Sequence, residues 1–177
     1  MKKMFIIIPI LIAAVGFIFL FGVMQKQKKI EDIIICENIN EICEIEYTKD
    51  TGIGKLIRED NFWYYEGEDI FAADRAMVEE QLEVLSIISP KGIVKRDKKE
   101  DAYGLEKPKY SISLKNDNGQ EKTIYVGNEN EDKDYYIRID EQKEIYIVSQ
   151  EIKDVIVRFY SQQRMFERFD AYTSPTR

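Results

Sequence analysis

The fold of this chain is decided by residues 110–148, which read YSISLKNDNGQEKTIYVGNENEDKDYYIRIDEQKEIYIV. Apolar and polar side chains alternate cleanly at residues 110–115, as they do in a strand that buries one face, and three further strand-like segments follow. The segments are residues 110–115, 123–126, 135–139 and 145–148. The pair Asn118-Gly119 between the first two segments favours a type I′ turn. We therefore expect an antiparallel meander with one face toward water.

Two further strands are expected upstream, at Ile30–Cys36 and at Cys43–Tyr47. If the two strands form a hairpin over Asn38–Asn40, Cys36 would lie opposite Cys43. Two interpretations of these cysteines are open: a cross-strand disulfide, or two small buried thiols. Two cysteines are too few for a disulfide framework or a four-thiolate zinc site.

An aromatic hairpin is expected next, with strands at Lys55–Arg58 and Asn61–Tyr65 after a turn at Thr51–Gly54. The alternation of side chains along a strand places Trp63 and Tyr65 on the same face. These rings either belong to the core, as the aromatic side chains of a single strand usually do, or form a binding surface that stacks on a sugar or a peptide.

Two helices are predicted around these strands. Asp74 is a favourable N-cap for the first helix, which Ser89-Pro90 should stop. Its apolar stripe consists of Val78, Leu82, Leu85 and Ile88. The stripe of the second, closing helix consists of Ile152, Val155, Ile156, Phe159 and Phe166. The predicted fold class is α+β, with an N-terminal transmembrane helix followed by a mainly antiparallel sheet and two packed helices.

The segment Met4–Met24 contains no charged residue. As a helix it would be about 31 Å long, which matches the hydrocarbon core of a bilayer. Lysines follow it without a small-residue cleavage site, and Cys36 comes too late for a lipoprotein, so we expect an uncleaved signal anchor. The short N-terminal tail favours a cytoplasmic N-terminus. We expect an anchor at residues 1–29, an extracytoplasmic domain at 30–169 and a loose tail at 170–177.

The composition excludes several functions. The 177 residues carry a net charge of −7, which argues against nucleic acid as a partner. The chain has no histidine, so neither a Ser-His-Asp nor a Cys-His system can form within it. Paired carboxylates are plentiful, but the sequence does not single out one pair for acid–base work. No catalytic residue, cofactor or metal ion is predicted.

One acidic stretch, Asn128–Asp134, begins like a calcium-binding loop. Lys133 stands where that loop needs glycine, and Ile139 stands where it needs glutamate. We therefore expect a solvated hairpin loop.

Several motifs in a fixed order resemble a known family. They are Trp63 in a strand, Ala73-Asp74 opening a helix, Tyr103-Gly104-Leu105 followed by Pro108, the Gly119 turn, Val126-Gly127, Tyr135-Tyr136 and the strand Ile145–Val148. Over roughly residues 42–153 the chain resembles the bacterial domain of unknown function 4340 family. The resemblance implies a membrane-anchored protein with an extracytoplasmic α+β domain, often encoded beside ABC-type export systems of the kind linked to gliding motility. No activity is established for the family, so no catalytic residue is carried over.

The Tyr103, Gly104, Leu105 and Pro108 motif has a structural interpretation. We expect a tight turn into the strand at Tyr110, in which Gly104 takes a positive φ and Pro108 fixes the entry.

Two functions from different classes are compatible with these features. The sequence favours a non-enzymatic, membrane-tethered module that binds a partner, such as a component of an ABC-type exporter. The alternative is a cell-envelope ligand-binding protein or enzyme that uses Trp63, Tyr65 and surface carboxylates. A structural spacer with no specific ligand is a third possibility.

Overall fold

The computed structural model describes residues 30–50, 52–67, 70–94, 100–140 and 142–173, with residues 166–173 described by their backbone alone. The expected anchor Met4–Met24 lies outside these ranges. Within them, no helix is both long and apolar enough to cross a membrane.

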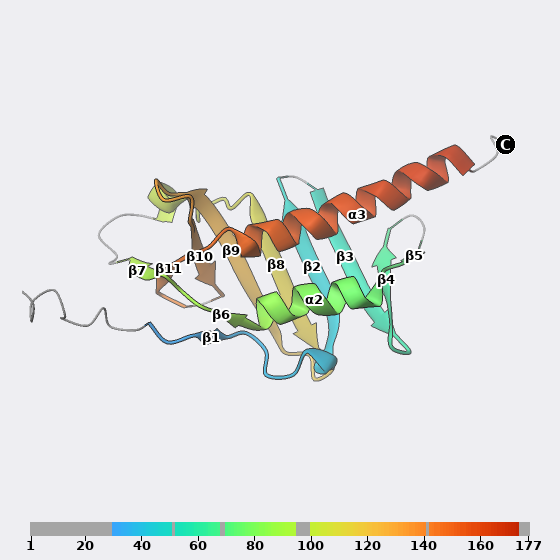
Figure 1. The fold of residues 1–177 in the computed structure, drawn as a ribbon, viewed down its shortest axis with the longest axis horizontal. Helices are drawn as coiled ribbons and strands as arrows, with labels where there is room; N and C mark the ends of the chain where they lie inside the picture. Colours follow the sequence, from blue (N-terminus) through green and yellow to red (C-terminus); the bar gives the residue numbers. More distant parts are fainter. Residues whose placement is uncertain (1–29, 51, 68–69, 95–99, 141, 174–177) are drawn as a thin grey trace, which may run out of the picture.

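A single antiparallel sheet forms the body of the protein (Figure 1). In the described part of the chain it has nine strands, in the order β5-β4-β3-β2-β8-β9-β10-β11-β7. Their bounds, in that order, are Phe71–Ala72, Phe62–Glu66, Gly52–Glu59, Ile42–Lys49, Tyr110–Asn116, Glu121–Glu129, Tyr135–Ile139, Ile145–Val148 and Gly92–Val94. The predicted meander from β8 to β11 is confirmed.

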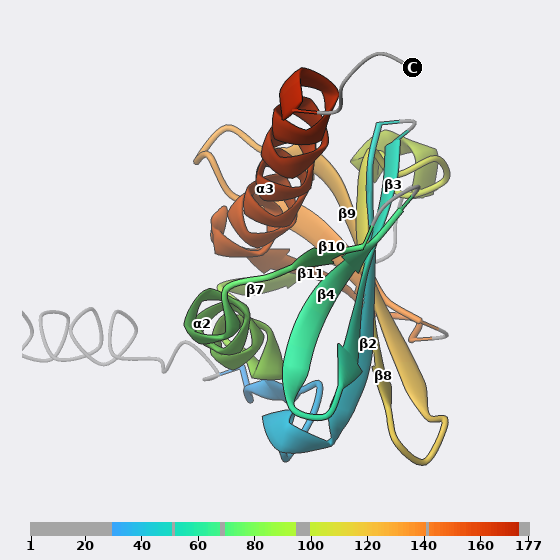
Figure 2. The same ribbon diagram turned by 90° about the vertical axis from the view of Figure 1, so that its right-hand side faces the viewer.

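Two helices, α2 (Arg75–Ser86) and α3 (Glu151–Thr173), cover the same face of this sheet (Figure 2). A short ribbon of β1 (Ile33–Ile34) and β6 (Ile87–Ile88) lies beside α2. Two 3-10 turns, η1 (Ile39–Glu41) and η2 (Glu100–Tyr103), connect the strands. The predicted α+β class, with a mainly antiparallel sheet and two helices, is confirmed for the described domain.

The predicted helices form for the predicted reasons. Asp74 caps α2 by accepting a hydrogen bond from the Met77 N–H at 3.2 Å. The side chains of Val78, Leu82 and Leu85 are buried against the sheet and α3, and so are those of Ile152, Val155, Ile156 and Phe159 from α3. Two details of the prediction were wrong: α2 ends at Ser86, so Ile88 lies in β6, and α3 continues past Phe169 to Thr173.

The predicted hairpin between Ile30–Cys36 and Cys43–Tyr47 does not form. Of the first segment only Ile33–Ile34 is a strand, and it pairs with β6, whereas the second segment lies within β2. The cause is the end of α2: the Ser86 carbonyl accepts hydrogen bonds from the Ile35 N–H at 2.8 Å and the Cys36 N–H at 3.4 Å. Cys36 and Cys43 are free thiols, and both are half-buried rather than buried.

Two predicted turns differ in the structure. Gly52 and Gly54 belong to β3, and a Cβ on Gly54 would lie 2.3 Å from the Tyr47 ring, so glycine allows this close approach. The β8–β9 hairpin is not a type I′ turn, because Gly119 (φ +78°) is its one described residue with positive φ. The Gly119 N–H donates to the Asn116 carbonyl at 2.9 Å, as in a type I turn followed by a left-handed glycine.

The second face of the sheet is partly covered by the loop that carries η2. Tyr103 and Leu105 pack there with Ile145 and the partly buried rings of Tyr125 and Tyr136. Gly104 has a φ of +71°, as predicted. This small second cluster covers the second face of the sheet at β9, β10 and β11.

Candidate functional site

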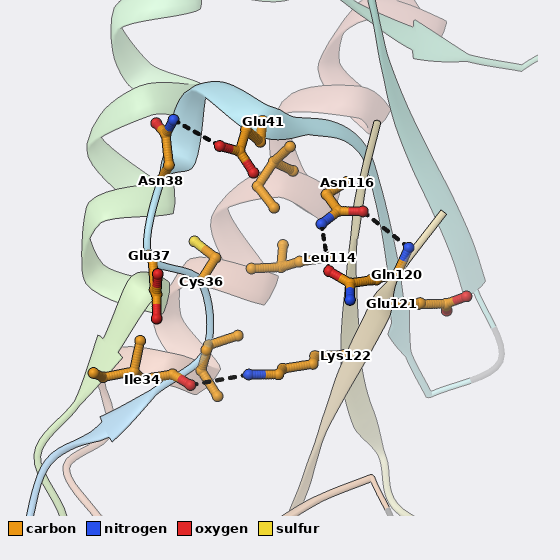
Figure 3. A pocket seen from close by; sticks show the side chains of 12 residues that line it. Ile34, Cys36, Glu37, Asn38, Glu41, Leu114, Asn116, Gln120, Glu121 and Lys122 are labelled. Atoms are coloured by element: carbon orange, nitrogen blue, oxygen red, sulfur yellow. Dashed lines mark hydrogen bonds between the residues drawn. The ribbon is translucent and has the colours of Figure 1, made fainter. Parts of the chain in front are cut away.

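A groove of about 640 Å³ lies between the chain that follows β1 and the tip of the β8–β9 hairpin (Figure 3). We call it the η1 groove. One wall consists of Ile34, Ile35, Cys36, Glu37, Asn38, Glu41 and Ile42, and the other of Leu114, Asn116, Gln120, Glu121 and Lys122. The walls are far apart in the sequence and meet only in the folded domain.

The first wall is fixed by the Asn38 side chain. Its Oδ1 accepts from the Asn40 N–H at 3.0 Å, which caps η1. Its Nδ2 donates to Glu41 Oε1, also at 3.0 Å. One amide therefore orders the turn and orients a carboxylate at the rim of the groove.

The second wall is fixed in a similar way by the Asn116 side chain. Its Oδ1 accepts from the backbone N–H groups of Asn118 at 3.1 Å and Gln120 at 2.9 Å. Its Nδ2 donates to Gln120 Oε1 at 3.0 Å, and both side chains line the groove (Figure 3). Across the groove, Lys122 Nζ donates to the Ile34 carbonyl at 3.1 Å and links the two walls.

The floor is apolar and contains one thiol. Ile35, Ile42 and Leu114 are each 3% exposed, and Cys36 is half-buried beside them. Burial raises the pKa of the Cys36 thiol, nearby Lys122 lowers it less, and Glu41 raises it further. The thiol is therefore protonated at neutral pH, and a protonated thiol is a poor nucleophile.

The charge of the groove is negative overall. The lining contains three carboxylates, Glu37, Glu41 and Glu121, and one cation, Lys122. The Lys122 ammonium group donates a hydrogen bond to the Ile34 carbonyl. The walls thus offer amide donors, carboxylate acceptors and an apolar floor, which together suit an extended polar chain with basic side chains. The residues that line the groove include no aromatic ring on which a sugar could stack.

The predicted aromatic pair does not belong to this groove. Trp63 is 2% exposed and Tyr65 is 1% exposed, and both lie in the core under the helices. The Tyr65 hydroxyl donates to Gln162 Oε1 of α3 at 2.9 Å. Their interpretation as a binding surface was wrong, because strand alternation turns both rings toward α2 and α3. Both rings belong to the core, as the other interpretation of this hairpin predicted.

The turn motif has the predicted structural role. Tyr103 packs edge-on against Tyr136, with ring centroids 5.0 Å apart, and Leu105 is buried beside it. A Cβ on Gly104 would lie 2.4 Å from Asn128 Oδ1, so the turn sits closely on β9. Pro108 precedes the strand at Tyr110.

The calcium-like stretch is a hydrogen-bonded hairpin loop. Asn130 Oδ1 accepts from the N–H groups of Asp132 and Asp134, both at 2.9 Å. The Asp134 carboxylate pairs with Lys91 Nζ at 2.6 Å. Glu129 accepts from Lys133 and the Tyr135 hydroxyl, and these hydrogen bonds lower its pKa. Among the residues with described side chains, no group of three potential ligands could hold a metal ion.

The groove itself was missed by sequence reasoning. Its one local signal is an asparagine that orders a turn on each wall, Asn38 and Asn116. Such residues are common in turns and do not indicate which turns will face each other.

The fold and the groove define a class: an antiparallel α+β domain with a polar groove at one margin of its sheet. The chain belongs to the family described as Domain of unknown function (DUF4340), whose sequence profile matches residues 63–160, over half of its length. No curated protein and no solved structure matches it. The matched residues include the β8–β9 wall of the groove but not the wall at residues 34–42, so the complete groove extends beyond the shared segment.

Proposed function

We propose that this protein is a membrane-anchored, extracytoplasmic and non-enzymatic module that binds a peptide segment of a partner in the η1 groove. The partner that we propose is a component of an ABC-type export system. The anchor is supported by the uncharged segment Met4–Met24. The type of partner is supported by the family resemblance.

The observation that carries the proposal is the lining of the groove. Gln120 supplies an amide donor, Glu37 and Glu41 supply acceptors, and Leu114 supplies an apolar floor. A peptide backbone needs donors and acceptors together, and basic side chains would be attracted by the excess of carboxylates.

The same lining supports binding rather than catalysis. The chain has no histidine to act as a base near neutral pH. Cys36, the one thiol in the groove, has a raised pKa because it is partly buried. Glu41 already accepts a hydrogen bond from Asn38. Nothing in this set provides an activated nucleophile with its base.

The first experiment tests the location. A reporter that is active only outside the cytoplasm is fused to the C-terminus of the full chain, and the cells are fractionated. The proposal predicts an active reporter in the membrane fraction. A soluble mature protein that lacks its first two dozen residues would remove the anchor and contradict the proposal.

The second experiment tests the partner. Intact cells that make the full chain are treated with a crosslinker, and the adducts are identified by mass spectrometry. We expect a membrane subunit of an exporter among them. Glu37→Lys in the groove should reduce this adduct, whereas Glu46→Lys, an exposed position on the helix-free face, should not. Equal recovery from both variants would argue against the groove as the binding site.

A further inference from the structure

The β1–β6 ribbon exposes two large apolar side chains next to each other. Ile34 is 53% exposed and Ile87 is 55% exposed, and they are direct partners across the ribbon. The other partners, Ile33 and Ile88, pack against the core, with Ile88 only 3% exposed. We call Ile34 and Ile87 the isoleucine pair.

The isoleucine pair is held in a fixed position. A two-stranded ribbon is only marginally stable alone, but this one is joined to the sheet through Lys122 and packs Ile33 and Ile88 on the core. The Ile35 N–H donates to the Ser86 carbonyl at 2.8 Å, Lys122 Nζ donates to the Ile34 carbonyl at 3.1 Å, and the Ser89 hydroxyl donates to Asp32 Oδ1 at 2.7 Å. The pair therefore presents a permanent apolar surface.

The ribbon also contains β1, the first strand in the described part of the chain. In the sequence, residues 25–32 separate Met24 from the start of β1, and a fully extended chain of that length spans at most about 28 Å. Figure 1 shows β1 and β6 on the side of the domain where the described chain begins. A domain tethered at this point can place the ribbon against the membrane that holds it.

We propose that the isoleucine pair contacts the surface of that bilayer, at the boundary between headgroups and acyl chains. This inference rests on the proposed membrane anchor. Two side chains alone would bind lipid weakly, but a short tether raises the effective concentration to the order of millimolar. Glu31 and Asp32 next to the ribbon are exposed and acidic, and the tether carries Lys26, Lys28 and Lys29, so the contact is assigned to the apolar pair and not to a charge preference.

The contact would also position the η1 groove. Ile34 belongs both to the isoleucine pair and to the lining of the groove. A ribbon on the membrane therefore holds one end of the groove close to the lipid surface. The segment that binds there would then come from a loop near the bilayer rather than from a distant part of a partner.

The test uses the full chain in nanodiscs of phosphatidylcholine. Cys36 and Cys43 are replaced by serine, and a single cysteine is introduced as Ile87→Cys and labelled with an environment-sensitive fluorophore. The matched control is Ile53→Cys, at a residue that is 67% exposed on the helix-free face. Circular dichroism checks that every variant folds like the unmodified chain.

We expect the label at position 87 to emit at shorter wavelength than the label at position 53, and only the former to be quenched by nitroxide-bearing lipid. Adding Ile34→Glu to the Ile87→Cys chain should return its emission to that of the control. If the chain enters nanodiscs but both labels emit as in water, the isoleucine pair does not contact lipid and the anchor stands. If the chain fails to enter nanodiscs, both the anchor and this inference are wrong.

Discussion

The two faces of the sheet are built in opposite ways. The face under α2 and α3 carries the largest buried side chains of the domain, among them Trp63, Tyr47 and Tyr65. Across the same strands, the other face carries an ion-pair network in which Lys55 Nζ lies 3.2 Å from Glu44 and 3.1 Å from Glu66. The strands β2, β3 and β4 thus divide their residues between a dry layer and a wet one, whereas the η2 loop covers the second face of β9, β10 and β11.

The stabilising core and the candidate groove occupy different parts of the sheet. Burial of large side chains under the helices should account for most of the folding free energy, since exposed ion pairs contribute little. The η1 groove lies at the margin of the helix-covered face, where the core residue Leu114 becomes its floor. The groove therefore uses the margin of the core as its floor and does not interrupt the centre of the core.

The largest expected change in the free energy of unfolding comes from substituting one of two neighbouring residues in β4. Trp63→Ala should lower the free energy of unfolding by about 3–5 kcal/mol, because it leaves a large cavity under the helices. Phe62→Ala, on the opposite face at 61% exposure, should change it by about 0.5 kcal/mol or less. Urea unfolding of the detergent-solubilised chain, followed by far-UV circular dichroism, measures both. Equal losses would show that the two faces do not differ as described.

The second-largest expected loss of stability concerns the part of the second face that the η2 loop covers. A Cβ on Gly127 would lie 2.1 Å from the Tyr103 carbonyl oxygen, so Gly127→Ala should cost about 2–3 kcal/mol by lifting the η2 loop. Gly119→Ala meets open space but keeps a positive φ, and should cost about 1 kcal/mol. Hydrogen exchange should increase at residues 100–105 in the first variant only. An unchanged exchange rate there would mean that the loop does not pack on β9.

A smaller effect depends on pH. Tyr65→Phe removes the hydrogen bond to Gln162 and should cost about 1 kcal/mol at neutral pH. Burial raises the pKa of Tyr65 above that of the unfolded chain, so its neutral form stabilises the fold below the unfolded pKa of about 10. That contribution is lost as the pH rises further. The difference between wild type and Tyr65→Phe should therefore narrow above this pH in urea titrations, and a constant difference would contradict burial of the hydroxyl.

The smallest effect concerns the wet face. Lys55→Met should lower stability by about 0.5 kcal/mol at low salt and by less at high salt, because the ion pairs are half exposed. Lys55→Arg keeps the charge and serves as the control. Thermal unfolding at two salt concentrations measures both variants. A loss that does not depend on salt would show that packing of the lysine chain, and not its charge, is what matters.

Features that depend on local pattern could be predicted from the sequence. Alternation placed Trp63 and Tyr65 on one face, helical spacing placed Val78 and Leu82 in the core, and the turn motif required a positive φ at Gly104. Each of these follows from the geometry of a few consecutive residues.

Features that depend on pairing between distant segments could not be predicted. A two-residue strand such as β1 has no periodicity, so nothing in the sequence showed that Ile33 would pair with Ile88. The Trp63 and Tyr65 alternation fixed a shared face but not whether a helix would cover it. The first wall of the groove is held in place by hydrogen bonds from the chain after β1 to the Ser86 carbonyl at the end of α2. These hydrogen bonds join segments that are distant in the sequence, so no local pattern predicts them.

The central claim is that the η1 groove, and not the wet face, is where a partner binds. A photoactivatable residue is placed at Gln120 in one full-length chain and at Ile53 in another, and both are irradiated in intact cells. The account predicts a discrete adduct with a membrane protein from position 120 and none from position 53. Absence of an adduct from position 120, or the same adduct from both positions, would contradict it.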